Sequence, residues 1–89
     1  MLTEKYLNHP TFGLLFSLSI IDDQSSLYTT LYAHRLFFVV TVSETGLEFA
    51  SVTRNEARIV MENRLRFLRR SGLQRDFQAL QHVHQQTFH

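Results

Sequence analysis

The 89-residue sequence contains no cysteine and no tryptophan, only one proline and only three glycines. Without cysteine the chain has no disulfide framework, no thiol nucleophile and no cysteine-ligated zinc site. Three glycines leave no room for a glycine-rich phosphate loop. The longest apolar runs, residues 14–16 and 36–40, are far shorter than the about 20 residues that span a bilayer. The first residues also lack the order of a signal peptide, so we expect a soluble cytoplasmic protein.

Composition and charge indicate one small folded unit with two dissimilar halves. The sequence is 44% hydrophobic and 19% charged, an ordinary globular balance. Residues 1–53 hold two basic against five acidic side chains, whereas residues 54–89 hold seven arginines against three acidic side chains. A split of this kind predicts two structural units that meet partners differently, with a boundary near residue 53.

The first half is predicted to be β-structure. Between residues 12 and 20 the even positions are all large and apolar, the period-two pattern of a strand with a buried face. Residues 27–42 have high β-propensity with a break near Ala33, His34 and Arg35. Glu44-Thr45-Gly46 predicts a hairpin turn that leads into a strand over 47–52. Short antiparallel strands in about 45 residues predict a small barrel of the SH3 or Tudor type.

The second half is predicted to be a helical hairpin. Thr53 and Glu56 have capping-box spacing at the start of a helix that Gly72 ends. Residues 71–74 are expected to cap a second helix. The apolar positions of the two predicted helices are Ala57, Val60, Met61, Leu65 and Leu68 in the first, and Leu73, Phe77, Leu80, Val83 and Phe88 in the second. The stripes are narrow, so we expect the helices to lean on the barrel or on a partner.

Residue types that carry catalysis or bind metals occur without a supporting arrangement. His82 and His84 are two apart on a predicted helix, about 200° apart around its axis, and cannot share a metal ion. The remaining histidines have no ligand spacing, so we expect solvated surface histidines. Asp22 and Asp23 lie in a predicted turn, which adjacent carboxylates commonly initiate. We expect no enzyme activity, no metal and no cofactor.

An arginine-rich segment, residues 64–70, permits two interpretations. Clustered cations with an interleaved Phe67 suit nucleic-acid binding by a Tudor/KOW module. However, this half carries only +4 net charge, the other half is acidic, and the pI of about 8.3 is below the usual range of such modules. We favour a solvated helix face or a protein contact. A small RNase-like toxin is a further alternative, although no acid–base pair supports it.

Strand alternation predicts an exposed aromatic surface. If Leu27 and Leu31 face the core, the intervening side chains face outward. Exposed Tyr, Phe and Arg on a rigid sheet are typical of a protein-binding hot spot. The alternative is that both faces of so small a sheet are covered. The predicted outward set is Tyr28, Tyr32, His34, Arg35 and one of Phe37 and Phe38.

Five segments of the sequence resemble the PipX family of cyanobacterial PII-interacting regulators. The segments are residues 6–15 (YLNHPTFGLL), 30–38 (TLYAHRLFF), 54–58 (RNEAR), 63–66 (NRLR) and 86–88 (QTF). The resemblance covers residues from about 4 to the end of the sequence. It implies an α+β fold: a small five-stranded Tudor-like (KOW/SH3-like) β-barrel over residues 1–53, followed by a two-helix C-terminal hairpin over 54–89.

The resemblance also implies a partner-swapping adaptor in nitrogen and carbon signalling. Such a protein coactivates the dimeric transcription factor NtcA when 2-oxoglutarate is high. Trimeric PII sequesters it when 2-oxoglutarate is low and ADP prevails, and the complex with PII recruits the GntR-type regulator PlmA. The small molecules bind PII and NtcA. For this chain the resemblance implies no cofactor, no direct nucleic-acid or membrane contact, and a monomer when free.

By the same resemblance, PII and NtcA compete for one face of the Tudor-like domain. Position 34 is His where the family is expected to have Gln, which adds a possible pH sensitivity. The two helices are expected to pack on the barrel in the free protein and to swing away in the PII complex. The expected partner-binding residues are Glu4, Tyr6, Tyr32, His34, Arg35, Leu36, Phe38 and Arg69.

Overall fold

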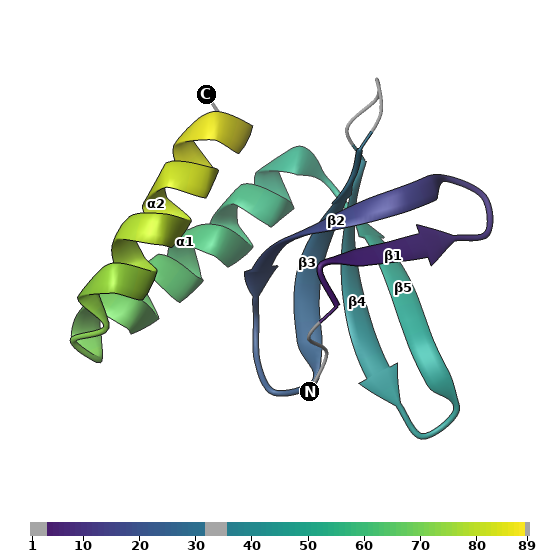
Figure 1. Ribbon diagram of the computed structural model, residues 1–89, viewed down its shortest axis with the longest axis horizontal. Coiled ribbons are helices and arrows are strands. Elements are labelled where there is room, and N and C mark those ends of the chain that lie inside the picture. The colour runs from purple at the N-terminus through teal and green to yellow at the C-terminus, as the bar shows by residue number, and fades with distance from the viewer. Residues whose placement is uncertain (1–3, 32–35, 89) are drawn as a thin grey trace.

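The computed structural model describes residues 4–31 and 36–88, which form one antiparallel sheet followed by two helices (Figure 1). The strands pair in chain order, β1-β2-β3-β4-β5, and the sheet curls into a half-barrel. The expected α+β architecture is confirmed. The elements are β1 (Tyr6–His9), β2 (Gly13–Ile20), β3 (Ser25–Thr30), β4 (Phe37–Ser43), β5 (Gly46–Val52), α1 (Arg54–Arg70) and α2 (Gln74–Thr87).

Turn residues fix the connections as their chemistry predicts. Gly46 has φ +127° and pairs with Ser43 across the β4–β5 hairpin, a conformation that glycine adopts without a steric cost. Asp22 Oδ1 accepts the backbone N–H groups of Gln24 and Ser25, both at 2.9 Å. This Asp therefore builds the β2–β3 turn, as expected of a turn carboxylate.

β1 is the strand that residue pattern did not predict. Its four residues, Tyr-Leu-Asn-His, do not alternate between apolar and polar types, although they alternate in burial once the strand pairs with β2. His9 is bound into the turn that follows: its Nδ1 accepts the backbone N–H groups of Thr11 at 3.0 Å and Phe12 at 3.2 Å. The His9 ring also contacts the Phe49 ring of β5, with 5.0 Å between centroids. A side-chain contact thus joins the two edge strands.

Two hydrophobic clusters cover the two faces of the sheet. The helix-side cluster lies between the sheet and the helices, and the inner cluster lies within the curl. The helix-side cluster consists of Leu18, Leu27, Phe37, Ala57, Met61, Leu68, Phe77 and Leu80. The inner cluster consists of Leu15, Tyr28, Phe38 and Val40, with Leu7 and Phe49 against it. Successive residues of β3 and β4 therefore alternate between two buried environments.

This arrangement corrects the predicted outward set. Tyr28 is fully buried, and Phe37 and Phe38 are only 2% and 3% exposed. Alternation places Phe37 and Phe38 on opposite faces, but neither face is open, because the helices cover one face and the curl of the sheet covers the other. Tyr32, His34 and Arg35 lie outside the described residues.

The helical hairpin begins and turns as the sequence predicts, except at the second cap. Thr53 and Glu56 form the capping box, with the Thr53 hydroxyl accepting the Glu56 N–H at 3.0 Å. Gly72 has φ +71° and ends the first helix at the turn into α2. The second helix has Leu73 at its N-cap and no side-chain cap, so the expected capping by residues 71–74 is wrong. Leu73 is also 44% exposed rather than part of the apolar stripe.

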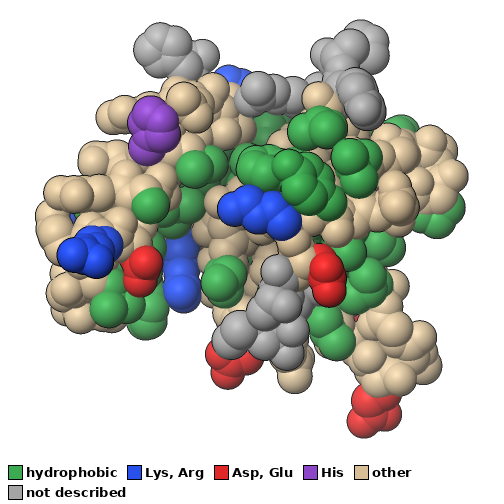
Figure 2. All heavy atoms as spheres, viewed as in Figure 1, with side chains coloured by type: hydrophobic (Ala, Val, Ile, Leu, Met, Phe, Trp, Pro, Cys, Tyr) green, Lys and Arg blue, Asp and Glu red, His purple; other side chains and the backbone are tan. Residues whose placement is uncertain are grey.

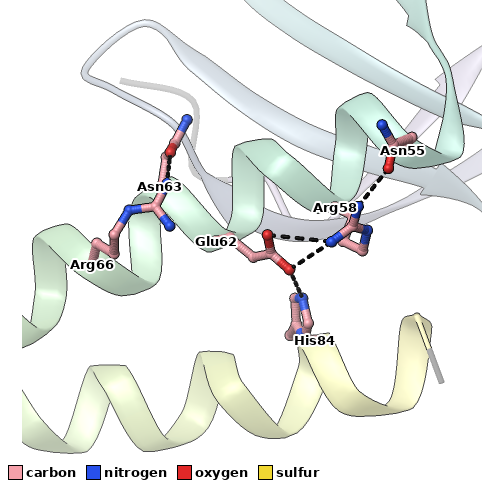
Figure 3. A network of polar contacts seen from close by, with 6 residues as sticks. All are labelled: Asn55, Arg58, Glu62, Asn63, Arg66 and His84. Atoms are coloured by element: carbon pink, nitrogen blue, oxygen red, sulfur yellow. Dashed lines mark hydrogen bonds and ion pairs between the residues drawn. The ribbon is translucent and has the colours of Figure 1, made fainter.

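Polar contacts join the two helices (Figure 3). Glu62 of α1 lies between Arg58, at 3.1 Å, and His84 of α2, whose Nε2 is 3.2 Å from the Glu62 carboxylate. Arg66 does not extend this network, because its guanidinium donates to Asn63 instead. His84 is therefore a helix-to-helix contact and not the solvated histidine that the sequence predicted.

Candidate protein-binding face

The residues expected to bind partners occupy several positions around the sheet. Tyr6 is 51% exposed, and its ring lies against Phe16, on the helix-side face. Phe38 belongs to the inner cluster on the opposite face. The described residues of the expected set therefore do not share one surface of the sheet. Phe38 supports the inner cluster, and its expected outward orientation is wrong.

Glu4 is held close to the inner cluster through its backbone. The Tyr28 hydroxyl donates a hydrogen bond to the Glu4 carbonyl oxygen, and Tyr28 pairs with Phe38 across β3 and β4. Burial raises the pKa of the Tyr28 hydroxyl above its usual value, and the nearby Glu4 carboxylate adds to this rise. The neutral hydroxyl is thus kept as a donor that fixes the chain just before β1.

Leu36 lies at the base of the β3–β4 connection, where three hydrogen bonds hold it. Its carbonyl oxygen accepts the Thr30 N–H at 3.0 Å and the Thr29 hydroxyl at 2.9 Å. Its own N–H donates to the Thr30 hydroxyl at 3.0 Å. The Leu36 side chain is nevertheless 37% exposed. The backbone is fixed while the apolar side chain faces solvent, which suits a contact surface.

Two further exposed apolar side chains lie at the same end of the strands. Leu31 follows β3, is 46% exposed, and donates its N–H to Leu14 at the start of β2. Phe12, 46% exposed, precedes β2 and contacts the Phe38 ring at 5.5 Å. We name Phe12, Leu31 and Leu36 the end patch.

Sequence reasoning missed two members of the end patch. Alternation assigned Phe12 and Leu31 to the core, but both stand just outside the strands, where alternation no longer holds. The signal for Phe12 is the following Gly13, which has φ +75° where the turn over residues 10–12 enters β2.

Arg69 lies far from the end patch in the chain, in the last turn of α1. Its guanidinium stands over the Phe77 ring of α2, 4.8 Å from the ring centroid. This contact packs the arginine against its own hairpin, and Arg69 remains exposed. A partner would meet the guanidinium on the outer surface of the helices.

The described residues contain neither a group of three His, Asp or Glu side chains suited to a metal ion nor a helix able to cross a membrane. The fold and the end patch define the class: a small five-stranded half-barrel with a helical hairpin, whose candidate contact surface is apolar. Within that class the family is specific. A model of the family described as PipX, PII-interacting protein X, matches residues 3–88, so the chain belongs to the PipX family.

Membership makes the chain a PII-interacting regulatory protein, of a family that is not known as an enzyme family. A search of curated proteins found no match to the chain.

Proposed function

We propose that the chain is a partner-swapping adaptor that coactivates NtcA when 2-oxoglutarate is high and is sequestered by PII when 2-oxoglutarate is low and ADP prevails. The match to the PipX family over residues 3–88 carries this proposal, because it spans both the half-barrel and the hairpin. The complex with PII would recruit PlmA. The free protein would be a cytoplasmic monomer.

The mechanism is competition for one surface combined with stabilisation of a partner's active state. An adaptor shifts NtcA only if it binds the active conformation more tightly than the inactive one. PII needs only to occupy the same surface. The small molecules act on the partners, so this chain needs no cofactor of its own.

We place the shared surface at the end patch and the adjoining β3–β4 connection, and we propose that Glu4 and Tyr6 add contacts from other positions around the sheet. The exposed apolar side chains of the end patch stand on a backbone that hydrogen bonds hold. Little backbone ordering of Leu31 and Leu36 would oppose binding there. Phe38 would act from below, by supporting the Phe12 ring. The remaining members of the proposed surface are Tyr32, His34 and Arg35, and Arg69 would contribute from the hairpin.

The test is a pull-down of purified chain with PII, first with ADP and then with ATP plus 2-oxoglutarate. We expect binding with ADP that disappears with ATP and 2-oxoglutarate. The absence of binding in both states would overturn the proposal.

Surface variants locate the contact. Leu36→Ala should weaken PII binding about tenfold or more if Leu36 is a hot spot. Leu47→Ala is the matched control, because Leu47 is 41% exposed at the opposite hairpin. Tyr32→Ala should likewise weaken binding and leave the fold intact. Equal binding by the Leu36 and Leu47 variants would remove Leu36 from the contact surface.

Nucleic-acid binding by the arginine-rich helix is the competing function. Arg58 pairs with Glu62, Arg64 lies 4.7 Å from the Phe67 ring centroid, and Arg69 contacts Phe77, so several guanidinium groups already contact their own hairpin. A filter-binding titration at increasing salt tests it. Nucleic-acid binding that falls steeply with salt would favour this function over the adaptor.

A further inference from the structure

A cleft of about 380 Å³ opens between the sheet and the helical hairpin. Figure 2 shows this region from the front, with basic and acidic side chains on either side of the hollow between helices and sheet. Its lining includes the small residues Ser17 and Ser19 of β2 and Ala79 of α2. Residues of β2, α1 and α2 all line the cleft.

The floor of the cleft is apolar. Leu18 from β2, Leu68 from α1 and Leu80 from α2 form it, and each side chain is less than 10% exposed. Ile20, 41% exposed, stands at the end of β2 and also lines the cleft. An apolar group placed here would be removed from water on several sides, which is the usual source of affinity in ligand clefts.

Three charged side chains line the cleft: Lys5, Arg64 and Asp76. None of them makes an ion pair among the residues that the structure describes. The ammonium of Lys5 lies 5.9 Å from the Phe16 ring centroid, and Arg64 stacks on Phe67. Both cations are therefore positioned by aromatic rings while their donors stay available.

The single acidic side chain has a local reason to be there. Asp76 lies in the first turn of α2, where the helix dipole stabilises a negative charge. This is also the helix that lacks a side-chain cap. Two available cations against one carboxylate leave a net positive rim, which is complementary to a negatively charged ligand.

We propose that this cleft binds a small amphipathic anion: one acidic group joined to an apolar chain or ring. The acidic group would contact Lys5 and Arg64, and the apolar part would lie on the floor between β2 and the helices. Because such a ligand touches both the sheet and the hairpin, it would favour the form in which the hairpin is packed on the sheet. This proposal does not depend on the proposed adaptor function.

The probe for the test is 8-anilinonaphthalene-1-sulfonate, compared with its uncharged parent N-phenyl-1-naphthylamine. The two fluorescent compounds share their rings and differ in the sulfonate. We expect the folded protein to bind the sulfonate at one site and at least about fivefold more tightly than the parent, since a charge-assisted contact contributes that much. Equal affinity for the two compounds would overturn the proposal.

Blocking variants locate the binding site. Ala79→Trp should fill the cleft and weaken sulfonate binding about tenfold or more. Gln78→Trp is the matched control, because Gln78 is the exposed neighbour on the same helix and does not line the cleft. Circular dichroism establishes that both variants are folded. Equal sulfonate binding by the two tryptophan variants would place the site elsewhere and overturn the proposal.

Removing a positive charge and removing the negative charge of the cleft should change sulfonate affinity in opposite directions. Lys5→Gln and Arg64→Gln should each weaken sulfonate binding several-fold, whereas Asp76→Asn should tighten it. Arg75→Gln is the control for net charge, since Arg75 is exposed and outside the cleft. Weaker sulfonate binding in Asp76→Asn would show that this carboxylate does not oppose an anion in the cleft, and would overturn the proposal of an anion site.

Discussion

The inner cluster and the helix-side cluster differ in how they are built. The inner cluster comes entirely from the strands, so the curl of the sheet is enough to form it. The helix-side cluster combines three sheet residues with five residues of the helices, and it forms only when the hairpin packs on the sheet. The difference shows that the half-barrel holds a core of its own, whereas the hairpin depends on the sheet for burial.

The two clusters meet at neighbouring residues of one strand. Phe37 and Phe38 are adjacent in β4, and each lies in a different cluster. Phe88 stacks on Phe37, with 5.5 Å between ring centroids, whereas Phe12 and His9 contact Phe38. The two residues that contact the hairpin and the end patch, Phe37 and Phe38, are thus adjacent in β4.

The largest expected effect comes from emptying the centre of the helix-side cluster. Met61 is fully buried, so Met61→Ala should lower the free energy of unfolding by about 2–5 kcal/mol. In the inner cluster the matched variant is Val40→Ala, at a fully buried residue, with an expected loss of about 2–3 kcal/mol. Urea unfolding measures both.

Hydrogen exchange then separates the clusters. In Met61→Ala the amides of α1 and α2 should lose more protection than those of β3 and β4, because the hairpin depends on this cluster. Equal loss of protection across helices and strands would show that the two clusters form one cooperative unit.

A smaller effect is expected at the end of α2. Phe88 stacks on Phe37 and lies under the Arg54 guanidinium, 5.3 Å from its ring centroid. Phe88→Ala should lower stability by about 2 kcal/mol and loosen the last turn of α2. Thermal unfolding measures the change, with Leu73→Ala, an exposed apolar residue of the same hairpin, as the control. A loss no larger than that of the control would mean that Phe88 does not anchor the hairpin.

The capping box should contribute less again. Thr53→Ala should lower the free energy of unfolding by about 1 kcal/mol, since a helix donor loses its acceptor. Hydrogen bonds from the Thr53 backbone and hydroxyl lower the pKa of Glu56. The contribution of Glu56 to stability is therefore complete at pH values above the ordinary pKa of a glutamate, and it is lost as the pH falls through the lowered pKa of the folded state. When unfolding is measured between pH 7 and pH 3, the stability of Glu56→Gln should therefore fall less steeply with decreasing pH than that of the unchanged protein.

A change of similar size at neutral pH is expected for a hydrogen bond of the inner cluster. Tyr28→Phe removes the hydrogen bond to Glu4 and should lower stability by about 1 kcal/mol. Because the pKa of folded Tyr28 is raised, its contribution is complete below about pH 10 and is lost as pH rises through the folded value. Between pH 8 and pH 11 the free energy of unfolding should therefore fall less steeply with rising pH in Tyr28→Phe than in the control Tyr6→Phe. Identical slopes would contradict the burial of this hydroxyl group.

Local sequence signals predicted most elements because each signal acts over a few residues. The capping box of Thr53 and Glu56 and the turn glycines at 46 and 72 depend on neighbouring groups, and all are present. Exposure was harder to predict. The same alternation that correctly separated Leu27 from Tyr28 gave no sign that both would be buried, since burial depends on what covers each face.

By itself the sequence determined the order and type of the main elements, the start of α1 and, through resemblance, the PipX family. Only the tertiary structure decided that both faces of the sheet are covered, that β1 exists as an edge strand, and that His84 joins α2 to α1. It also left Phe12, Leu31 and Leu36 exposed at one end of the strands. The physical reason is range: caps and turns act between neighbours in the chain, whereas burial results from contacts between segments that the sequence keeps far apart.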